Sequence, residues 1–161
     1  MNEAYQTDTQ AAYVAMTTKQ LIQVVVFGAV AGLFVWGLTY VLETYVLKSL
    51  LCQVTQVSPC EVAVQYSEAV ATIVGGAIGL LVLVKIQVFR PLLVVIATVI
   101  SLWGLVGVLS ELPWYIVGLS SAGMYLLGYL LFTWVTRLRL FWLVIVLLLV
   151  LIVTMRLILT V

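Results

Sequence analysis

Five long apolar runs, separated by short polar or basic connections, fill most of the chain. They cover residues 20–47, 59–84, 92–109, 114–136 and 140–155. A helix of about 20 apolar residues is long enough to cross the hydrocarbon layer of a bilayer, which is about 30 Å thick. Since unpaired backbone groups are costly in lipid, a spanning segment of this length is helical. The pattern predicts an all-α transmembrane bundle of about five spans, forming a single domain over residues 1–161.

The composition agrees with a membrane protein that carries no catalytic centre. The chain is 65% hydrophobic and 8% charged, whereas about a quarter of the residues of a soluble domain are charged. A net charge of +1 gives no indication of nucleic-acid binding, and the chain has no histidine, the commonest general base and metal ligand. No phosphate loop, zinc-ligand cluster or catalytic triad is present. We therefore expect no enzyme activity, no cofactor and no metal site.

The first two spans are expected to form a hairpin whose connecting loop contains the only two cysteines, Cys52 and Cys60. The segment Ser58-Pro59-Cys60-Glu61 carries the signals of a helix start. A disulfide between Cys52 and Cys60 would close a short loop and contribute about 2–3 kcal/mol in the chain-entropy model. Two unpaired thiols are the alternative. A redox-active pair is less favoured, because the spacing is not that of a Cys-x-x-Cys motif.

The basic residues indicate how the chain is threaded, since Lys and Arg collect on the cytoplasmic side. A cytoplasmic N-terminus places five of the seven basic residues inside, namely Lys19, Lys85, Arg90, Arg137 and Arg139, and leaves Lys48 and Arg156 outside. The same orientation places the Cys52–Cys60 loop outside, where disulfides form. We expect an integral protein of the cell membrane, with residues 1–18 as a cytoplasmic tail or interfacial helix.

Small residues at helical spacing predict the faces at which the helices meet. Gly28 and Gly32 share a face of the first span, and Gly75, Gly76 and Gly79 form a small face of the second. Glycines at helix contacts let two backbones approach closely. We therefore expect the two glycine faces to pack against each other, antiparallel and at one level of the bilayer.

Polar residues mark the outer halves of the same stripes. Glu43, Glu68 and Thr72, with Glu111 at the end of the third span, would form an outward-facing polar vestibule that attracts a cation or a basic partner. The favoured interpretation is instead that these carboxylates mark the water boundary, because none lies near the centre of a span, where an ionisable residue indicates function.

The fifth run differs from the others because residues 140–153 include no small residue. It lacks a close-packing face and is expected at the edge of the bundle, against lipid or a partner subunit. These features favour a non-catalytic membrane protein that acts through helix contacts, either as an accessory subunit or as a self-associating scaffold. The alternatives are a small transporter or channel that uses the vestibule and, less favoured, a membrane thiol-disulfide oxidoreductase.

Overall fold

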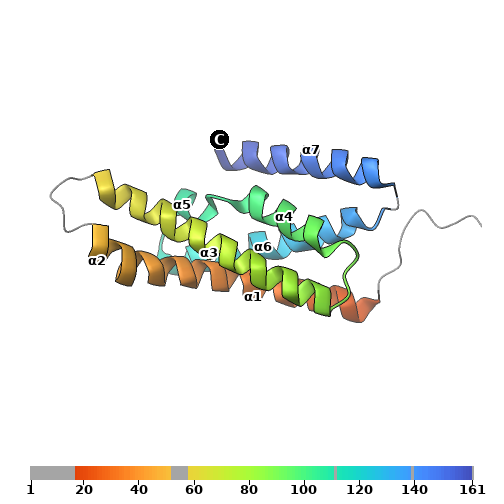
Figure 1. Ribbon diagram of the computed structural model, residues 1–161, viewed down its shortest axis with the longest axis horizontal. Coiled ribbons are helices and arrows are strands. Elements are labelled where there is room, and N and C mark those ends of the chain that lie inside the picture. Colours follow the sequence, from red (N-terminus) through yellow and green to blue (C-terminus); the bar gives the residue numbers. More distant parts are fainter. Residues whose placement is uncertain (1–16, 52–57, 111, 139, 161) are drawn as a thin grey trace, which may run out of the picture.

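The computed structural model describes residues 17–51, 58–110, 112–138 and 140–160, and these segments are helices joined by short connections. The helices are α1 (Thr18–Val41), the π-helix η1 (Leu42–Leu47), α2 (Lys48–Leu51), α3 (Ser58–Lys85), α4 (Pro91–Leu102), α5 (Leu105–Val108), α6 (Trp114–Thr136) and α7 (Phe141–Thr160). Figure 1 shows the long helices side by side, with α7 along one edge. The predicted all-helical bundle is confirmed.

Local sequence signals fix where two of these helices, α1 and α4, begin. The Thr17 hydroxyl accepts a hydrogen bond from the Gln20 N–H, and the Gln20 side chain accepts one from the Thr17 N–H, both at 3.3 Å. This reciprocal pair satisfies two N–H groups that have no partner within the helix. Pro91 occupies the first turn of α4, where its missing N–H costs nothing. The starts of α1 and α4 therefore follow from short-range chemistry.

Four helical segments are long and apolar enough to cross a membrane: Thr18–Leu47, Ala63–Lys85, Pro91–Val108 and Trp114–Thr136. α7 adds a shorter apolar stretch, Phe141–Leu157. Four of the five predicted spans are thus matched by helices of spanning length, and the fifth crossing stays a prediction. The proposed tail, residues 1–16, lies outside the described residues.

The closest helix contact is between α1 and α6, which run antiparallel. A Cβ placed on Gly28 would lie 2.8 Å from the Cα of Leu126, and one placed on Gly32 would lie 2.8 Å from the Cα of Ala122. Moving four residues forward along α1, from Gly28 to Gly32, therefore corresponds to moving four residues back along α6, from Leu126 to Ala122. The two backbones touch because both positions on α1 lack a side chain, as in other close contacts between membrane helices.

The expected pairing of the two glycine faces is wrong. Gly28 and Gly32 lie against the backbone of α6, whereas Gly75 of α3 faces the side chain of Val35 on α1. Gly79 faces the hydroxyl of Tyr129, and Gly76 faces Val99 of α4. The physical reason is that α1 lies against both α3 and α6. Its small face meets the backbone of α6, and a neighbouring valine fills the space left by the glycine of α3.

α7 packs against α4 and α6 through one stripe. Val144 and Leu148, one turn apart, are buried in this contact, while Trp142 is 79% exposed. Most of the remaining large side chains of α7 are also exposed. An apolar helix with so wide an uncovered surface faces lipid or another protein when it is in a membrane.

Candidate functional site

The third span is interrupted between α4 and α5. α4 ends at Leu102, Trp103 has an extended conformation, and Gly104 has φ +89° before α5 begins at Leu105 (Figure 1). Glycine adopts this left-handed conformation without the strain that a Cβ would cause. A break at this position removes helical hydrogen bonds, and in a membrane the freed N–H and C=O groups need other partners.

Glu68 of α3 provides partners for the N–H groups at the start of α5. Its Oε1 accepts from the Val106 N–H at 3.0 Å, and its Oε2 accepts from the Gly107 N–H at 3.1 Å. The Glu68 residue is 5% exposed. Hydrogen bonds to a carboxylate are shorter and stronger than neutral ones, and a negative charge is favourable at the N-terminal end of a helix. Glu68 thereby fixes α5 to α3.

Arg156 of α7 acts on the other side of the break. Its Nε donates to the carbonyl oxygen of Ile100, in the last turn of α4, at 3.0 Å. A cation is favourable at the C-terminal end of a helix, where carbonyl groups lack partners. The guanidinium also lies close enough to Glu68 to interact with its carboxylate. A carboxylate from α3 and a guanidinium from α7 therefore hold the two sides of the break.

An open groove leads to Glu68. It has a volume of about 410 Å³ and is lined by Val64, Gln65, Glu68, Gly104, Gly107, Val108 and Ser110. We call it the Glu68 groove. The interrupted backbone therefore lies at the wall of a cavity, which is one of the few places where irregular backbone is tolerated at membrane depth.

A second hollow adjoins this groove and has Val64 and Ser110 in common with it. It has a volume of about 210 Å³, and its lining includes three aromatic side chains, Trp36, Tyr40 and Trp114, and the carboxylate of Glu43. We call it the aromatic hollow. The two carboxylates, Glu43 and Glu68, thus lie in neighbouring cavities at the same end of the bundle.

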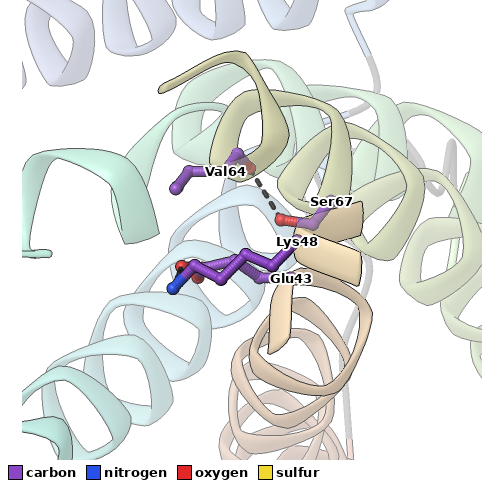
Figure 2. Close-up of polar contacts among 4 residues, drawn as sticks. All are labelled: Glu43, Lys48, Val64 and Ser67. Carbon is purple, nitrogen blue, oxygen red and sulfur yellow. Dashed lines mark hydrogen bonds and ion pairs between the residues drawn. The ribbon is translucent and has the colours of Figure 1, made fainter. Parts of the chain in front are cut away.

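Glu43 forms an ion pair with Lys48 because η1 is a π-helix. The Lys48 N–H bonds the carbonyl oxygen of Glu43, and the Lys48 Nζ lies 2.7 Å from the Glu43 Oε1. Residues five apart in an α-helix point about 140° away from each other. The wider turn of the π-helix places them on one side, as Figure 2 shows for the two side chains lying along each other near α3. Ser67 of α3, drawn in the same view, bonds its own helix at the Val64 carbonyl, at 2.8 Å.

Buried hydroxyl groups continue inward from Glu68. Thr72 lies one helical turn further along α3, is 1% exposed, and is a neighbour of the Tyr125 hydroxyl of α6. The hydroxyls of Ser101 and Ser121 are also buried and have no hydrogen-bond partner within the described segments. Buried polar groups of this kind usually bind protein groups or ordered water. The interior next to Glu68 therefore has polar groups available for a small ligand or water.

The predicted vestibule residues are placed as follows. Glu43 and Glu68 line the two adjoining cavities, and Thr72 is buried behind Glu68 without lining either of them. Glu111, Cys52 and the side chain of Cys60 lie outside the described residues, so the disulfide stays a prediction. Within the described part of the chain, no three acidic or cysteine side chains group as metal ligands would.

Sequence reasoning missed two parts of this site, the break at Gly104 and the role of Arg156. Arg156 gave a usable signal, because it is an ionisable residue within an apolar helix, and such residues usually have an internal partner. Gly104 gave only a weak one, since glycine is common in membrane helices.

No protein-family model matches the chain, and neither the curated proteins nor the solved structures include a significant match. The class of the protein therefore rests on its own fold. Four apolar helices of spanning length, packed as a bundle, indicate an integral membrane protein in contact with the lipid bilayer.

Proposed function

We propose that the protein is a small membrane transporter or channel without catalytic chemistry, and that the Glu68 groove admits a monovalent cation or a proton. One observation carries the proposal: a buried carboxylate of α3 binds the backbone N–H groups that follow the break in a membrane helix, at the wall of an open groove. Interrupted helices that line a cavity are a recurring way in which transporters build solute sites.

The groups around Glu68 are suited to this role. A buried carboxylate in a membrane helix is costly, and it is usually associated with an ion or proton pathway. The buried hydroxyls of Thr72 and Tyr125 lie further inside and neighbour each other. They supply oxygen atoms that a hydrated cation or a water chain needs.

The proposal is tested by measuring flux into liposomes that contain the purified protein. Uptake of Na⁺ and K⁺ and entry of protons are followed with ion-sensitive dyes, against protein-free liposomes. We expect flux of at least one of these ions, and a loss of about tenfold or more in Glu68→Gln. Ile73→Ala is the matched control, because Ile73 is exposed on the same helix and does not line the groove.

The proposal would be contradicted if liposomes that contain the wild-type protein conducted none of the three ions. Equal flux in the wild type and in Glu68→Gln would also contradict it. Both variants are first checked by size-exclusion chromatography and circular dichroism, so that a change in flux is compared only between folded proteins.

A second function, as an accessory subunit or self-associating scaffold, is favoured by a different observation. α7 buries Val144 and Leu148 and packs Leu147, Leu151 and Ile152 partly against the core, and its outer surface is uncovered in the described chain. Other membrane subunits or a second copy of the protein would cover this surface. Native mass spectrometry after gentle extraction tests this function: a larger particle supports it, and a bare monomer rules it out.

The orientation belongs to the same proposal. We place the N-terminus in the cytoplasm and the Cys52–Cys60 loop outside the cell membrane, with the two cysteines paired. The excess of basic residues at the cytoplasmic connections supports this orientation. The Glu68 groove then opens to the outside.

A further inference from the structure

We propose that the aromatic hollow binds an organic ammonium group, such as a quaternary or alkylated amine. Its wall contains Trp36, Tyr40 and Trp114 together with the Glu43 carboxylate. A cation placed over an aromatic face is attracted by the ring electrons, most strongly for tryptophan, and aromatic cages recognise quaternary ammonium ligands in this way. The inference is independent of transport, because a site of this kind can be occupied without any solute crossing the membrane.

The Trp36 ring stacks with both the Trp114 ring and the Tyr40 ring. The centroids of Trp36 and Trp114 are 6.3 Å apart with an angle of 17° between the planes, and those of Trp36 and Tyr40 are 6.4 Å apart at 26°. Trp36 is held in place by α6, since a Cβ on Gly118 would lie only 3.4 Å from its indole ring. The Trp36 ring is therefore fixed before any ligand arrives.

The size and lining of the hollow favour an organic cation over an inorganic one. Its volume of about 210 Å³ is below the range of roughly 300–1,000 Å³ that drug-sized ligands occupy. Val64, Val106 and Val117 contribute to the lining. Inorganic cations such as Ca²⁺ require several oxygen ligands, whereas methylated ammonium groups present an apolar surface to such walls.

Lys48 shows that the carboxylate of the hollow accepts an ammonium ion. Its Nζ lies 2.7 Å from the Glu43 Oε1 (Figure 2). The Lys48 side chain is 51% exposed and that of Glu43 is 21% exposed. Exposed ion pairs of this kind contribute little to stability. A ligand ammonium that also contacts the aromatic rings can therefore displace Lys48, which acts as a tethered competitor.

The test is a binding titration of the full-length protein, purified in a maltoside detergent without added lipid. Choline chloride and tetramethylammonium chloride are the probes, and tryptophan fluorescence and isothermal titration calorimetry are the readouts. Sodium chloride at the same ionic strength is the control. We expect saturable binding of the organic cations and none of Na⁺.

Three variants give the site a signature that a structural role would not produce. Trp114→Leu and Glu43→Gln should each weaken binding by about fivefold or more, because each removes one attraction. Lys48→Met should tighten it several-fold, because the competitor is gone. Trp142→Leu, which removes an exposed tryptophan of α7 outside the hollow, should leave the affinity unchanged. Trp114 is itself largely exposed, so its removal leaves the fold intact.

Nanodiscs distinguish an ammonium group of a lipid headgroup from that of a soluble amine. If a lipid headgroup is the ligand, choline should bind more weakly in nanodiscs of phosphatidylcholine than in nanodiscs of phosphatidylglycerol. Equal choline affinity in the two would identify a soluble amine. The inference is overturned if neither probe binds saturably, or if Trp114→Leu, Glu43→Gln and Lys48→Met all bind as the wild type does. The aromatic residues would then be ordinary anchors at the membrane interface.

Discussion

Glu68 replaces backbone hydrogen bonds that the third span lacks. In a continuous helix, the N–H groups of Val106 and Gly107 would bond the carbonyl groups of Leu102 and Trp103, four residues earlier. The chain leaves the helix at Trp103 and Gly104, so those bonds are not made. The two oxygens of the Glu68 carboxylate accept from the same two N–H groups. The residue therefore has a structural role in addition to the proposed functional one.

Glu68→Gln is expected to destabilise the protein by about 1–3 kcal/mol, the cost of leaving one buried donor without a partner. A glutamine side chain has a single carbonyl oxygen, so only one of the two N–H groups keeps its bond. Denaturant or thermal unfolding in detergent, followed by circular dichroism, measures the change.

Glu43→Gln is the matched control for that substitution. It also removes one carboxylate, but its partner Lys48 is half exposed, and such pairs contribute about 0–1 kcal/mol. If the two variants lost equally little stability, the Glu68 hydrogen bonds would not hold the break as described.

Among the helices, the contact between α1 and α6 determines where a side chain can be added. Gly32 has no space, because a Cβ there would overlap the backbone of Ser121 and Ala122. Gly37, on the same helix, is open, because a Cβ added there would have no heavy atom of the described residues within 4 Å. The sequence already separates the two glycines, since Gly32 shares a face with Gly28 and Gly37 does not, but only the structure shows that α6 covers this face.

Gly32→Ala should therefore lower the unfolding temperature, because α1 and α6 have to move apart to accept the methyl group. Gly37→Ala should leave the protein unchanged or stabilise it by up to about 1 kcal/mol, since alanine is the better helix former. Thermal unfolding of the two variants in one detergent makes the comparison. A Gly32→Ala protein at least as stable as the wild type would argue against the close α1–α6 contact.

The sequence predicts the elements well and their partners poorly. Long apolar runs identify the helices, because length and hydrophobicity are local properties. The apolar run at 92–109 contains no proline inside it, so its break at Gly104 has no strong local signal. The groups that stabilise the break, Glu68 and Arg156, lie 38 and 56 residues away along the chain from the backbone groups that they bind. Contacts at such separations depend on how the helices pack, which periodicity does not determine.

The positions of the two carboxylates also follow only in part from the sequence. Their spacing predicts that Glu43 and Glu68 lie on the outer halves of two spans, and the structure places them in adjoining cavities at one end of the bundle. The π-helix that pairs Glu43 with Lys48 does not follow from the sequence pattern, because α-helical spacing sets residues five apart on different sides.

For the whole molecule, the position of α7 decides how many times the chain crosses the membrane. α7 has 20 residues, which corresponds to a rise of about 30 Å, close to the thickness of the hydrocarbon layer. It runs along the bundle from the end where α6 finishes towards the opposite end (Figure 1). A fifth crossing would place the C-terminus outside when the N-terminus is inside.

Reporter fusions measure this directly. We expect green fluorescent protein to fluoresce when it is fused to the N-terminus, and alkaline phosphatase to be active when it is fused to the C-terminus, because each works on one side of the membrane only. A fluorescent C-terminal fusion without phosphatase activity would show that α7 does not cross.

The central claim is that the Glu68 groove is open to water on the outer side, and cysteine labelling tests it most directly. In a Cys52→Ser, Cys60→Ser background, Gln65→Cys and Val108→Cys place single thiols in the groove. Ile73→Cys and Ile100→Cys place thiols on exposed apolar faces of the same two spans, outside the groove. A membrane-impermeant maleimide added to intact cells should label positions 65 and 108 and leave 73 and 100 unlabelled. Protection of 65 and 108 would place the groove in lipid or on the cytoplasmic side and contradict the account.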